Sequence, residues 1–417
     1  MRRIGTRLLG LALCVGLAWP AAAATSPPTW TGSWATALVP TDAANLPAPQ
    51  GEVTIRQVVR LGAGGPRLRL RLANTFGTAP LRIDGARVAL AAAPGGSGIV
   101  AETDRAVTFD GQAGVTIPPG ATWLSDPVNL PVEGLARLAV SLRLPEVPRQ
   151  ASVHRSARTT AFVVAGDQLA APELTGASTF TQWAQLAGVD VERPSGKGMA
   201  VVTLGDSITD GSGAGVDVYE RWPDVLAARL QADPRAKGVS VLNVGIGGNK
   251  LLKDGSGQAA LARLDRDVLT QPGVKALIVL IGINDIGGLS REGEVTPEKR
   301  TQVVTGLIAA YRQIVPRAHE RGIRVMGATI LPCGGTKVYR SDADADADRQ
   351  AVNAWIRGSG VFDAVLDFDQ VTRDPAHPER LLPAYDSGDQ LHPSPAGYKA
   401  MGEAVAIGQL AGAGKRR

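Results

Sequence analysis

One serine, one aspartate and one histidine stand at positions where they could do nucleophilic chemistry. Residues 205–211 read Gly-Asp-Ser-Ile-Thr-Asp-Gly and directly follow the apolar run 200–204. Far downstream, Asp389 and His392 are three residues apart. A serine hydroxyl is a weak nucleophile until a base takes its proton, and a histidine oriented by a carboxylate can be that base. The two motifs therefore predict a hydrolase whose nucleophile is Ser207.

The elements around these motifs have the pattern of an α/β sheet. Runs that are apolar on both faces, as buried parallel strands are, cover residues 200–204, 239–244, 276–281, 323–330 and 364–368. Helical patterns lie between or after them, at residues 222–230, 259–269, 297–321 and 349–355, and Ser394 before Pro395 predicts one more helix start. Five strands that alternate with helices predict a doubly wound parallel sheet.

The preceding part of the chain, from about residue 30 to residue 189, has a different pattern. Leucines at positions 68, 70 and 72 alternate with arginines at positions 67, 69 and 71, and residues 138–144 alternate in the same way. Period-two alternation with frequent Gly and Pro turns predicts half-buried antiparallel strands. We therefore expect a β-sandwich, of which a jelly roll is one form. We interpret the three arginines as the solvent-facing side of a sheet, the alternative being contact with an anionic polysaccharide or with the other domain.

The polar motifs follow the predicted parallel strands. Ser207 comes after the first strand, residues 243–249 (Asn-Val-Gly-Ile-Gly-Gly-Asn) after the second and residues 282–285 (Gly-Ile-Asn-Asp) after the third. Asp389 and His392 come after the fifth, beyond a loop. In an open parallel sheet the functional groups gather beyond the carboxyl ends of the strands. We therefore expect these segments to meet at one edge of the sheet.

In this order and context, the four motifs resemble the four blocks of the SGNH hydrolases, also called GDSL esterases and lipases. The resemblance covers residue 200 to the C-terminus and implies a flavodoxin-like doubly wound sheet. It also implies that Ser207 is the nucleophile, His392 the base and Asp389 its orienting partner. The implied oxyanion hole consists of the Ser207 N–H, the Gly248 N–H and the Asn284 side chain. Of the adjacent glycines, the spacing from Asn243 favours Gly248 over Gly247.

Other readings of the same residues remain open. Ser207 could only cap a helix, Asp389 and Asn284 could only shape turns, and Gly248 could serve backbone geometry alone. Of the four histidines, His154 lies in the β-rich region, His319 on a predicted helix and His377 in a Pro-flanked loop, which leaves His392 as the economical base. Asp206 and Asp210 are interpreted as braces of the serine loop and not as catalytic groups.

Composition limits the cofactors and partners. Three arginines near the N-terminus, the apolar residues 8–18 and the small residues 21–24 predict a signal peptide cleaved near Ala24, and hence a secreted or periplasmic protein. The six cations of this leader and of residues 415–417 exceed the formal net charge of +5, so the charge predicts no nucleic-acid partner. Cys14 lies in the leader, and we expect no disulfide, no metal and no cofactor. The alternation Asp-Ala over residues 342–348 lacks the glycine and glutamate of a calcium loop, and we expect a solvated loop there.

The sequence thus predicts a signal peptide at residues 1–24, a β-sandwich domain at 25–191, a linker at 192–198 and a hydrolase domain at 199–417. The predicted activity is hydrolysis of carboxylic esters through an acyl-enzyme. Short acyl groups on carbohydrates, or small aryl or lipid esters, are the expected substrates. The alternatives are a glycan-binding protein with a vestigial hydrolase domain, and an acyltransferase. We also expect the β-rich region to fold independently, so that a chain beginning near Gly198 keeps some activity on a small aryl ester but loses proportionally more on an acetylated polysaccharide.

Overall fold

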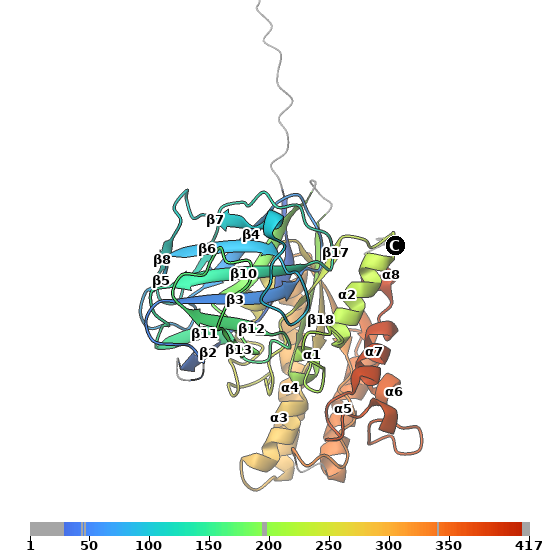
Figure 1. The fold of residues 1–417 in the computed structure, drawn as a ribbon. Coiled ribbons are helices and arrows are strands. Elements are labelled where there is room, and N and C mark those ends of the chain that lie inside the picture. Colours follow the sequence, from blue (N-terminus) through green and yellow to red (C-terminus); the bar gives the residue numbers. More distant parts are fainter. Residues whose placement is uncertain (1–28, 43–44, 46, 194–197, 340–341, 411–417) are drawn as a thin grey trace, which may run out of the picture.

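A computed structural model describes residues 29–42, 45, 47–193, 198–339 and 342–410. A β-rich region, drawn in blue to green in Figure 1, lies against an α/β region drawn in green to red. The predicted leader and residues 194–197 of the predicted linker lie outside the described residues, so the domain bounds stay a prediction. Across the part of the chain that the structure describes, no helix has the length and apolarity that crossing a membrane requires.

The α/β region is built on a five-stranded parallel sheet, as the sequence predicted. The strand order is β17-β16-β18-β19-β20, with β16 (Met199–Gly205), β17 (Val239–Asn243), β18 (Val274–Leu280), β19 (Arg324–Ala328) and β20 (Ala364–Leu366). The chain first runs outward from β16 to β17 and then returns past β16 to β18. Such a reversal leaves a crevice at the carboxyl ends of the two central strands, which is where ligands bind in open α/β sheets.

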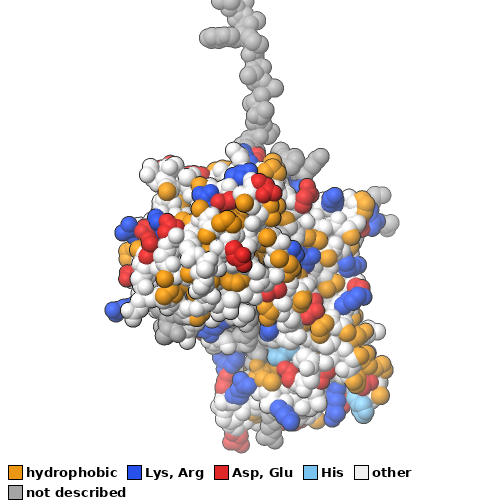
Figure 2. All heavy atoms as spheres, viewed as in Figure 1, with side chains coloured by type: hydrophobic (Ala, Val, Ile, Leu, Met, Phe, Trp, Pro, Cys, Tyr) orange, Lys and Arg blue, Asp and Glu red, His pale blue; other side chains and the backbone are white. Residues whose placement is uncertain are grey.

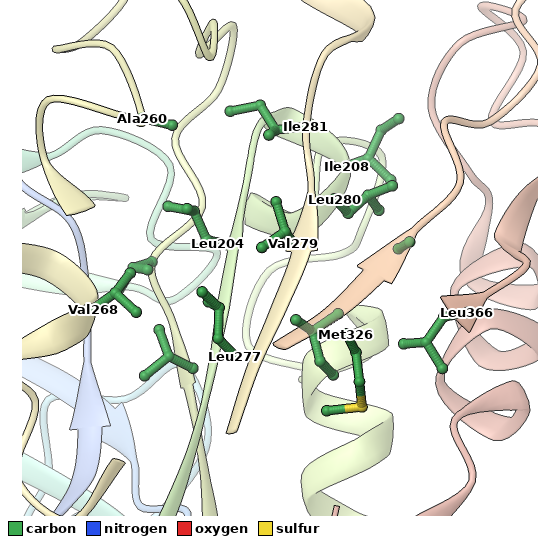
Figure 3. Close-up of a cluster of buried hydrophobic side chains, with 14 of the residues drawn as sticks. Leu204, Ile208, Ala260, Val268, Leu277, Val279, Leu280, Ile281, Met326 and Leu366 are labelled. Carbon is green, nitrogen blue, oxygen red and sulfur yellow. The ribbon is translucent and has the colours of Figure 1, made fainter. Parts of the chain in front are cut away.

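Apolar side chains on both faces of this sheet explain its burial. Leu204, Leu277 and Val279 of the central strands are at most 1% exposed, and they pack with Val268, Ile281 and Met326 (Figure 3). A sheet that is buried on both sides needs helices on both sides. The helices accordingly form two contacting groups, in which α2 (Trp222–Ala232) and α6 (Phe368–Thr372) contact α7 (Pro395–Ala404), while α3 (Ile283–Gly288), α4 (Pro297–His319) and α5 (Ala343–Gly358) contact one another.

Two predicted helices differ from the structure. The helical pattern at residues 259–269 gives only a short π-helix, η3 (Asp265–Leu269), preceded by turns. Arg263, in the turns before it, is fully buried and donates to the backbone oxygens of Gly205 and Val244, which ties the turns to the carboxyl ends of β16 and β17. The helix predicted at 349–355 begins earlier, as α5, because the Asp342 side chain accepts a hydrogen bond from the Ala345 N–H and caps it. The expected solvated loop at 342–348 is therefore mostly helix.

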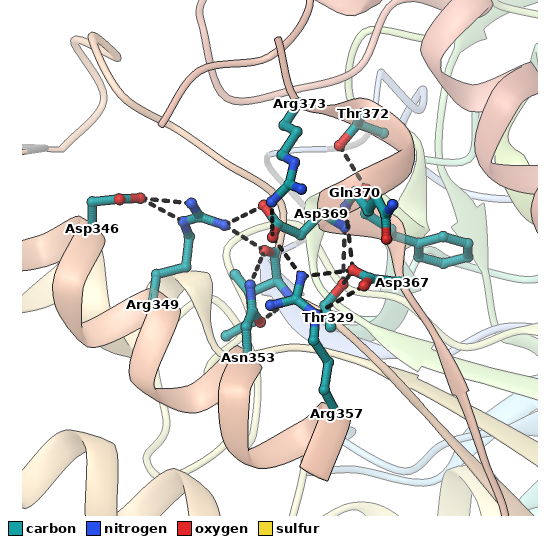
Figure 4. Close-up of polar contacts among 12 residues, drawn as sticks. Thr329, Asp346, Arg349, Asn353, Arg357, Asp367, Asp369, Gln370, Thr372 and Arg373 are labelled. Carbon is teal, nitrogen blue, oxygen red and sulfur yellow. Dashed lines mark hydrogen bonds and ion pairs between the residues drawn. The ribbon is translucent and has the colours of Figure 1, made fainter. Parts of the chain in front are cut away.

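Ion pairs fix α5 to the ends of β19 and β20 (Figure 4). Arg349 of α5 is buried and donates to Asp369 Oδ1 at 2.7 Å, and Arg357 donates to both Asp367 and Asp369. The Thr329 hydroxyl donates to Asp367 at 3.0 Å. Buried charges are tolerated only when they are paired and hydrogen-bonded, as they are here. The network therefore holds the turn from β20 into α6, from which the chain continues to Asp389.

The β-rich region has a core of its own between two antiparallel sheets, which makes it the expected sandwich. One sheet has the order β1-β15-β4-β9 and the other the order β13-β12-β3-β10-β6-β7. Apolar residues of β3, β4, β10 and β15 share one core. The strands are β1 (Thr29–Ala35), β2 (Val39–Asp42), β3 (Val53–Arg60), β4 (Leu68–Ala73), β5 (Leu81–Ile83), β6 (Gly85–Leu90), β7 (Arg105–Val107), β8 (Val115–Ile117), β9 (Thr122–Leu124), β10 (Arg137–Leu144), β11 (Gln150–His154), β12 (Ala161–Ala165), β13 (Ser178–Phe180), β14 (Trp183–Ala184) and β15 (Leu186–Arg193).

The three arginines of β4 are not a free cationic surface. Arg67 pairs with Glu192, while Arg69 and Arg71 both pair with Asp190, which is fully buried on the neighbouring strand β15. Arg71 also donates to Gln271 of the α/β region at 2.7 Å. Contact with the other region was the second reading of this stripe, and the structure supports it at Arg71. On the face shown in Figure 2, basic and acidic side chains are likewise interspersed.

The two regions share a continuous apolar core, which argues against an independently folding β-rich unit. Ala35, Ala37, Val39 and Val153 belong to the same buried cluster as the α/β sheet. The Gly32 N–H donates to the Pro272 oxygen at 2.8 Å, and the Gly32 oxygen accepts a hydrogen bond from the Ser240 hydroxyl. Strand β1 thus packs on β17 while it pairs with β15. Separating the regions would expose this core.

Candidate active site

Ser207 begins a single helical turn at the carboxyl end of β16. The Asp206 side chain accepts a hydrogen bond from the Ile208 N–H at 3.0 Å and caps the turn, α1 (Ser207–Asp210). Gly211 ends the turn with a φ of 105°, a conformation that favours glycine. The N–H groups of a first helical turn have no partner inside the helix. The Ser207 N–H is therefore available to an oxygen that approaches its side chain.

The structure brings Ser207, His392 and Asp389 into one hydrogen-bonded row. Ser207 Oγ lies 2.8 Å from His392 Nε2, and His392 Nδ1 lies 2.6 Å from Asp389 Oδ2. An ionised carboxylate can only accept hydrogen bonds, so the proton sits on Nδ1 and Nε2 is free to accept from the serine hydroxyl. This is the arrangement that proton removal from a nucleophilic serine requires.

Asp389 is held in the ionised form. Burial alone would raise the pKa of Asp389, but hydrogen bonds from the His392 N–H, the His392 ring and the Leu391 N–H outweigh burial and keep this pKa below its ordinary value. Spacing alone does not single out this pair, because Asp374 and His377 are also three residues apart. His377 is exposed and its ring lies 3.8 Å from Glu379, so only His392 is joined to the serine.

The two adjacent glycines after β17 have different partners. The Gly247 N–H donates to Asp210 Oδ2 at 2.9 Å, so this donor is already used. The Gly248 N–H donates to no acceptor within the described part of the chain, and Gly248 has a φ of 72°. This difference favours Gly248, as the spacing did, as the glycine whose N–H can meet a substrate oxygen.

Asn284 lies on the first turn of α3 with its amide orientation fixed. Its Nδ2 donates to the Asn249 oxygen at 3.0 Å, and its Oδ1 accepts a hydrogen bond from the Tyr339 hydroxyl. An amide nitrogen carries two hydrogens, so one remains for a third group. Tyr339 was not predicted from the sequence, because it lies in a loop far from the four motifs and nothing around it has a recognisable spacing.

Arg263 is a second residue that the sequence analysis missed. Besides the two backbone oxygens described above, it donates to Asn249 Oδ1 from both Nε and Nη2. It therefore ties the serine strand, the glycine loop and the Asn284 partner together. The sequence signal was a basic residue within the otherwise apolar residues 259–264, which more commonly marks a solvent-facing position.

Two buried carboxyl groups near the serine bind protons more tightly than usual. Burial raises the pKa of Asp206 to about 7 and that of Asp285 to about 6. Asp285 also accepts hydrogen bonds from the N–H groups of Leu251 and Leu252. Both acids brace loops, which agrees with the interpretation of Asp206 as a structural residue.

The raised pKa of Asp206 predicts a pH-dependent stability. The pKa of Asp206 is about 7 in the folded protein and about 4 in the unfolded chain. The protonated side chain therefore contributes stability that is fully present below about pH 4 and is lost as the pH rises through about 7. Asp206→Asn cannot ionise, so its Tm relative to the wild type should increase as the pH rises from about 4 to about 7. Thermal unfolding at several pH values measures this, with Asp110→Asn at an exposed turn as control. A Tm difference that is constant with pH would contradict the prediction.

Comparison with known proteins identifies relatives of the α/β region. Residues 203–400 match the model of the GDSL-like Lipase/Acylhydrolase family. Similar solved structures include a protein assigned to the G-D-S-L lipolytic family of Desulfitobacterium hafniense DCB-2 (25% identity, TM-score 0.35, covering 49% of this chain and 96% of that one). The acetylxylan esterase Axe2 of Geobacillus stearothermophilus is another (24%, 0.36, 49% and 91%), as is a GDSL-like lipase of Bacteroides thetaiotaomicron VPI-5482 (19%, 0.37, 50% and 87%). No curated protein matches the chain.

The matched segment runs from β16 to α7 and contains Ser207, Gly248, Asn284, Asp389 and His392. The β-rich region lies outside it. Residues 203–400 therefore form a GDSL-like lipase/acylhydrolase domain, which makes the protein a carboxylic ester hydrolase.

Proposed function

We propose that the protein is a secreted or periplasmic serine esterase that removes short acyl groups, acetyl first among them, from carbohydrate esters through an acyl-enzyme. The observation that carries the catalytic part is the row of Ser207, His392 and Asp389, joined at 2.8 Å and 2.6 Å. The available N–H groups of Ser207 and Gly248 and the amide of Asn284 support an oxyanion hole beside it. Export rests on the predicted signal peptide.

Acylation uses His392 first as base and then as acid. Nε2 takes the proton of the Ser207 hydroxyl while Oγ forms a bond to the ester carbonyl carbon. The carbonyl oxygen becomes negative and accepts hydrogen bonds from the Ser207 N–H, the Gly248 N–H and Asn284. When the tetrahedral intermediate collapses, the bond to the alcohol oxygen breaks and His392 returns the proton to that oxygen. Asp389 stabilises the imidazolium that exists between the two transfers.

Deacylation repeats these steps with water. His392 takes a proton from a water molecule, whose oxygen attacks the acyl carbon, and the same three donors hold the oxyanion. The bond to Ser207 Oγ then breaks and His392 returns the proton to the serine. The products are a carboxylic acid and the free alcohol, so no metal, cofactor or oxidant enters the balance.

A substrate panel tests the acyl and alcohol parts of the proposal. p-Nitrophenyl esters of increasing chain length should show the highest kcat/KM for acetate, and acetylated xylan, pectin and chitin fragments should release acetate. A preference for long acyl chains, or no release from any carbohydrate ester, would contradict the proposed substrate class. An added sugar that receives the acyl group faster than water does would identify an acyltransferase instead. If an activated ester gives no burst of product that depends on Ser207, the protein is instead the glycan-binding protein with a vestigial hydrolase domain.

Asn284→Ala should lower kcat by roughly 10²-fold to 10³-fold while KM changes little, because an oxyanion donor acts mainly in the transition state. Asn284→Asp keeps the size of the side chain but loses the donor, so it should lose at least as much. Steady-state kinetics with p-nitrophenyl acetate measure both variants. If KM rises while kcat stays, Asn284 binds the substrate and does not stabilise the oxyanion.

A further inference from the structure

A histidine of the β-rich region reaches the catalytic loops. His154, at the end of β11, is 4% exposed, and its Nε2 lies 2.8 Å from Asp210 Oδ1. Asp210 is 2% exposed and belongs to α1, the turn that Ser207 begins. The other ring nitrogen, Nδ1, lies 2.9 Å from the Ala37 oxygen. His154 is therefore not the base of the serine, but it contacts the turn that carries the serine.

The pair is an ion pair enclosed between the two regions. Both ring nitrogens of His154 face oxygens that accept, so the ring carries both protons and faces the Asp210 carboxylate as a cation. Burial would lower the pKa of His154, but the charge and the hydrogen bond of Asp210 outweigh it and raise this pKa. The ring also stacks on Trp183, with centroids 5.4 Å apart. Arg221, paired with Asp224, is the nearby cation that opposes this charge.

Asp210 also hydrogen-bonds to the glycine loop after β17. Its second oxygen, Oδ2, accepts the Gly247 N–H at 2.9 Å. The neighbouring Gly245 fits tightly on the same turn, because a side chain at that position would come within 2.5 Å of the Asp210 nitrogen. The carboxylate of Asp210, which belongs to the turn that carries Ser207, thus binds both His154 and the loop that carries Gly248.

We propose that His154 is a positioning residue for the oxyanion hole, supplied to the esterase site by the β-rich region. The inference rests on the esterase function proposed above. His154 holds Asp210, Asp210 holds the Gly247 N–H, and the direction of the next N–H, that of Gly248, follows from the backbone of Gly247.

Glycine makes this anchor necessary. Without a Cβ, Gly247 and Gly248 have a wide range of backbone conformations, so the loop by itself does not fix where the Gly248 N–H points. An oxyanion donor contributes only when it is oriented in advance toward the developing charge. A buried, charge-assisted hydrogen bond restricts Gly247 to one orientation. The pair Asp210–His154 therefore restricts the backbone conformation of the loop, which its glycines alone do not.

Neighbouring contacts brace the other side of the serine turn from the same segment. The Arg158 side chain donates to the Ala214 oxygen, and the Arg158 backbone oxygen accepts from the Asp217 N–H at 2.9 Å. Thr160 donates to the Asp217 carboxylate from its N–H and its hydroxyl. Residues 214–217 directly follow the turn of Ser207. The β-rich region thus contacts the segment after the serine turn as well, while His154 hydrogen-bonds to the turn itself.

Two amide variants separate the two hydrogen bonds of His154. In His154→Gln the side-chain amide can take the place of Nε2 and still donate to Asp210, whereas in His154→Asn it takes the place of Nδ1 and reaches only the Ala37 oxygen. His154→Asn should lower kcat roughly 10-fold to 100-fold, because a small misplacement of a catalytic group has effects of about that size. Its KM should change by less than about twofold, and His154→Gln should retain most of the wild-type kcat.

Inhibition by an alkylboronic acid gives a readout that a purely structural role would not change. A boronate bound to Ser207 imitates the tetrahedral intermediate, so its Ki should rise in His154→Asn by the factor by which kcat/KM falls. His319→Asn is the matched control, since His319 Nε2 also lies 2.8 Å from an aspartate, Asp363, far from the serine along the chain. That variant should keep the wild-type kcat and Ki. Equal kinetics in His154→Asn and His154→Gln would overturn the inference.

Asp210→Ala keeps the proposal testable if His154→Asn fails to fold. It leaves His154 in place and removes the anchor of Gly247 directly, so kcat and boronate affinity should fall together. Wild-type boronate affinity in a folded Asp210→Ala enzyme would overturn the inference. The test also differs from that of the function: activity in Ser207→Ala would refute the esterase mechanism, whereas an inactive Ser207→Ala beside a fully active His154→Asn would refute only the role of His154.

Discussion

Ser207→Ala is expected to lower kcat by on the order of 10⁶-fold with the fold intact, because the variant removes the nucleophile and leaves a small side chain at the start of α1. Ser207 is buried in the turn, and among the described residues its side chain hydrogen-bonds to His392 alone, at 2.8 Å. Losing that bond should cost little stability beside its effect on catalysis. Hydrolysis of p-nitrophenyl acetate and the Tm measure the two effects separately.

His392→Ala should cause a loss of similar size, and the double variant should be no worse, because residues that act as one unit are not additive. A phosphonylating reagent should label Ser207 and no other serine, as peptide mass mapping can show. Ser178→Ala, on the outlying strand β13, is the control and should keep full activity and full labelling. Substantial activity in Ser207→Ala would end the acyl-enzyme mechanism.

Removal of the β-rich region is the second change with a large expected effect. A chain that begins at Gly198 should yield no soluble, active esterase, even toward small aryl esters. The truncation exposes β17 and the part of the shared core that Ala35, Ala37 and Val153 cover. It also removes His154, the oppositely charged partner of Asp210. This expectation replaces the one drawn from the sequence alone, in which the two regions fold separately.

The comparison should use a chain that begins at residue 25 as the reference, with soluble yield, near-ultraviolet circular dichroism and p-nitrophenyl acetate hydrolysis as measurements. Adding the separately expressed β-rich region should not restore activity if the core forms only when both regions fold together. A truncated protein that is soluble and hydrolyses the aryl ester at the wild-type rate would show that the shared core and His154 are dispensable.

The sequence by itself determined the parallel sheet and the residues of the candidate site. Short apolar runs predicted β16 to β20, because a strand that is buried on both faces is apolar at nearly every position. The motifs at their ends predicted Ser207, Gly248, Asn284, Asp389 and His392, because parallel strands place all their carboxyl ends at one edge. The structure brings Ser207, Asp389 and His392 together, and the N–H left available on Gly248 agrees with the choice between the two glycines.

Local signals also led to errors, each where a tertiary contact decided the outcome. The helical pattern at 259–269 is helical only from residue 264 onward, since buried Arg263 binds backbone oxygens at the carboxyl ends of β16 and β17 and the residues around it form turns. Helix α5 starts six residues before its predicted start because Asp342 caps it. The arginines of β4 look like a solvated stripe in the sequence, but Asp190 and Gln271 come to them from elements more than a hundred residues away.

Only the tertiary structure decided how the β-rich region takes part in the site. His154 and Asp210 are 56 positions apart, in different regions, and neither stands in a motif with the other. Tyr339 and Asn284 are 55 positions apart in the same way. Spacing in a sequence reports contacts within one helix, strand or turn, because only there does the distance along the chain fix the distance in space. The partners that orient the oxyanion donors come from separate elements, and their meeting is a result of how the two regions pack.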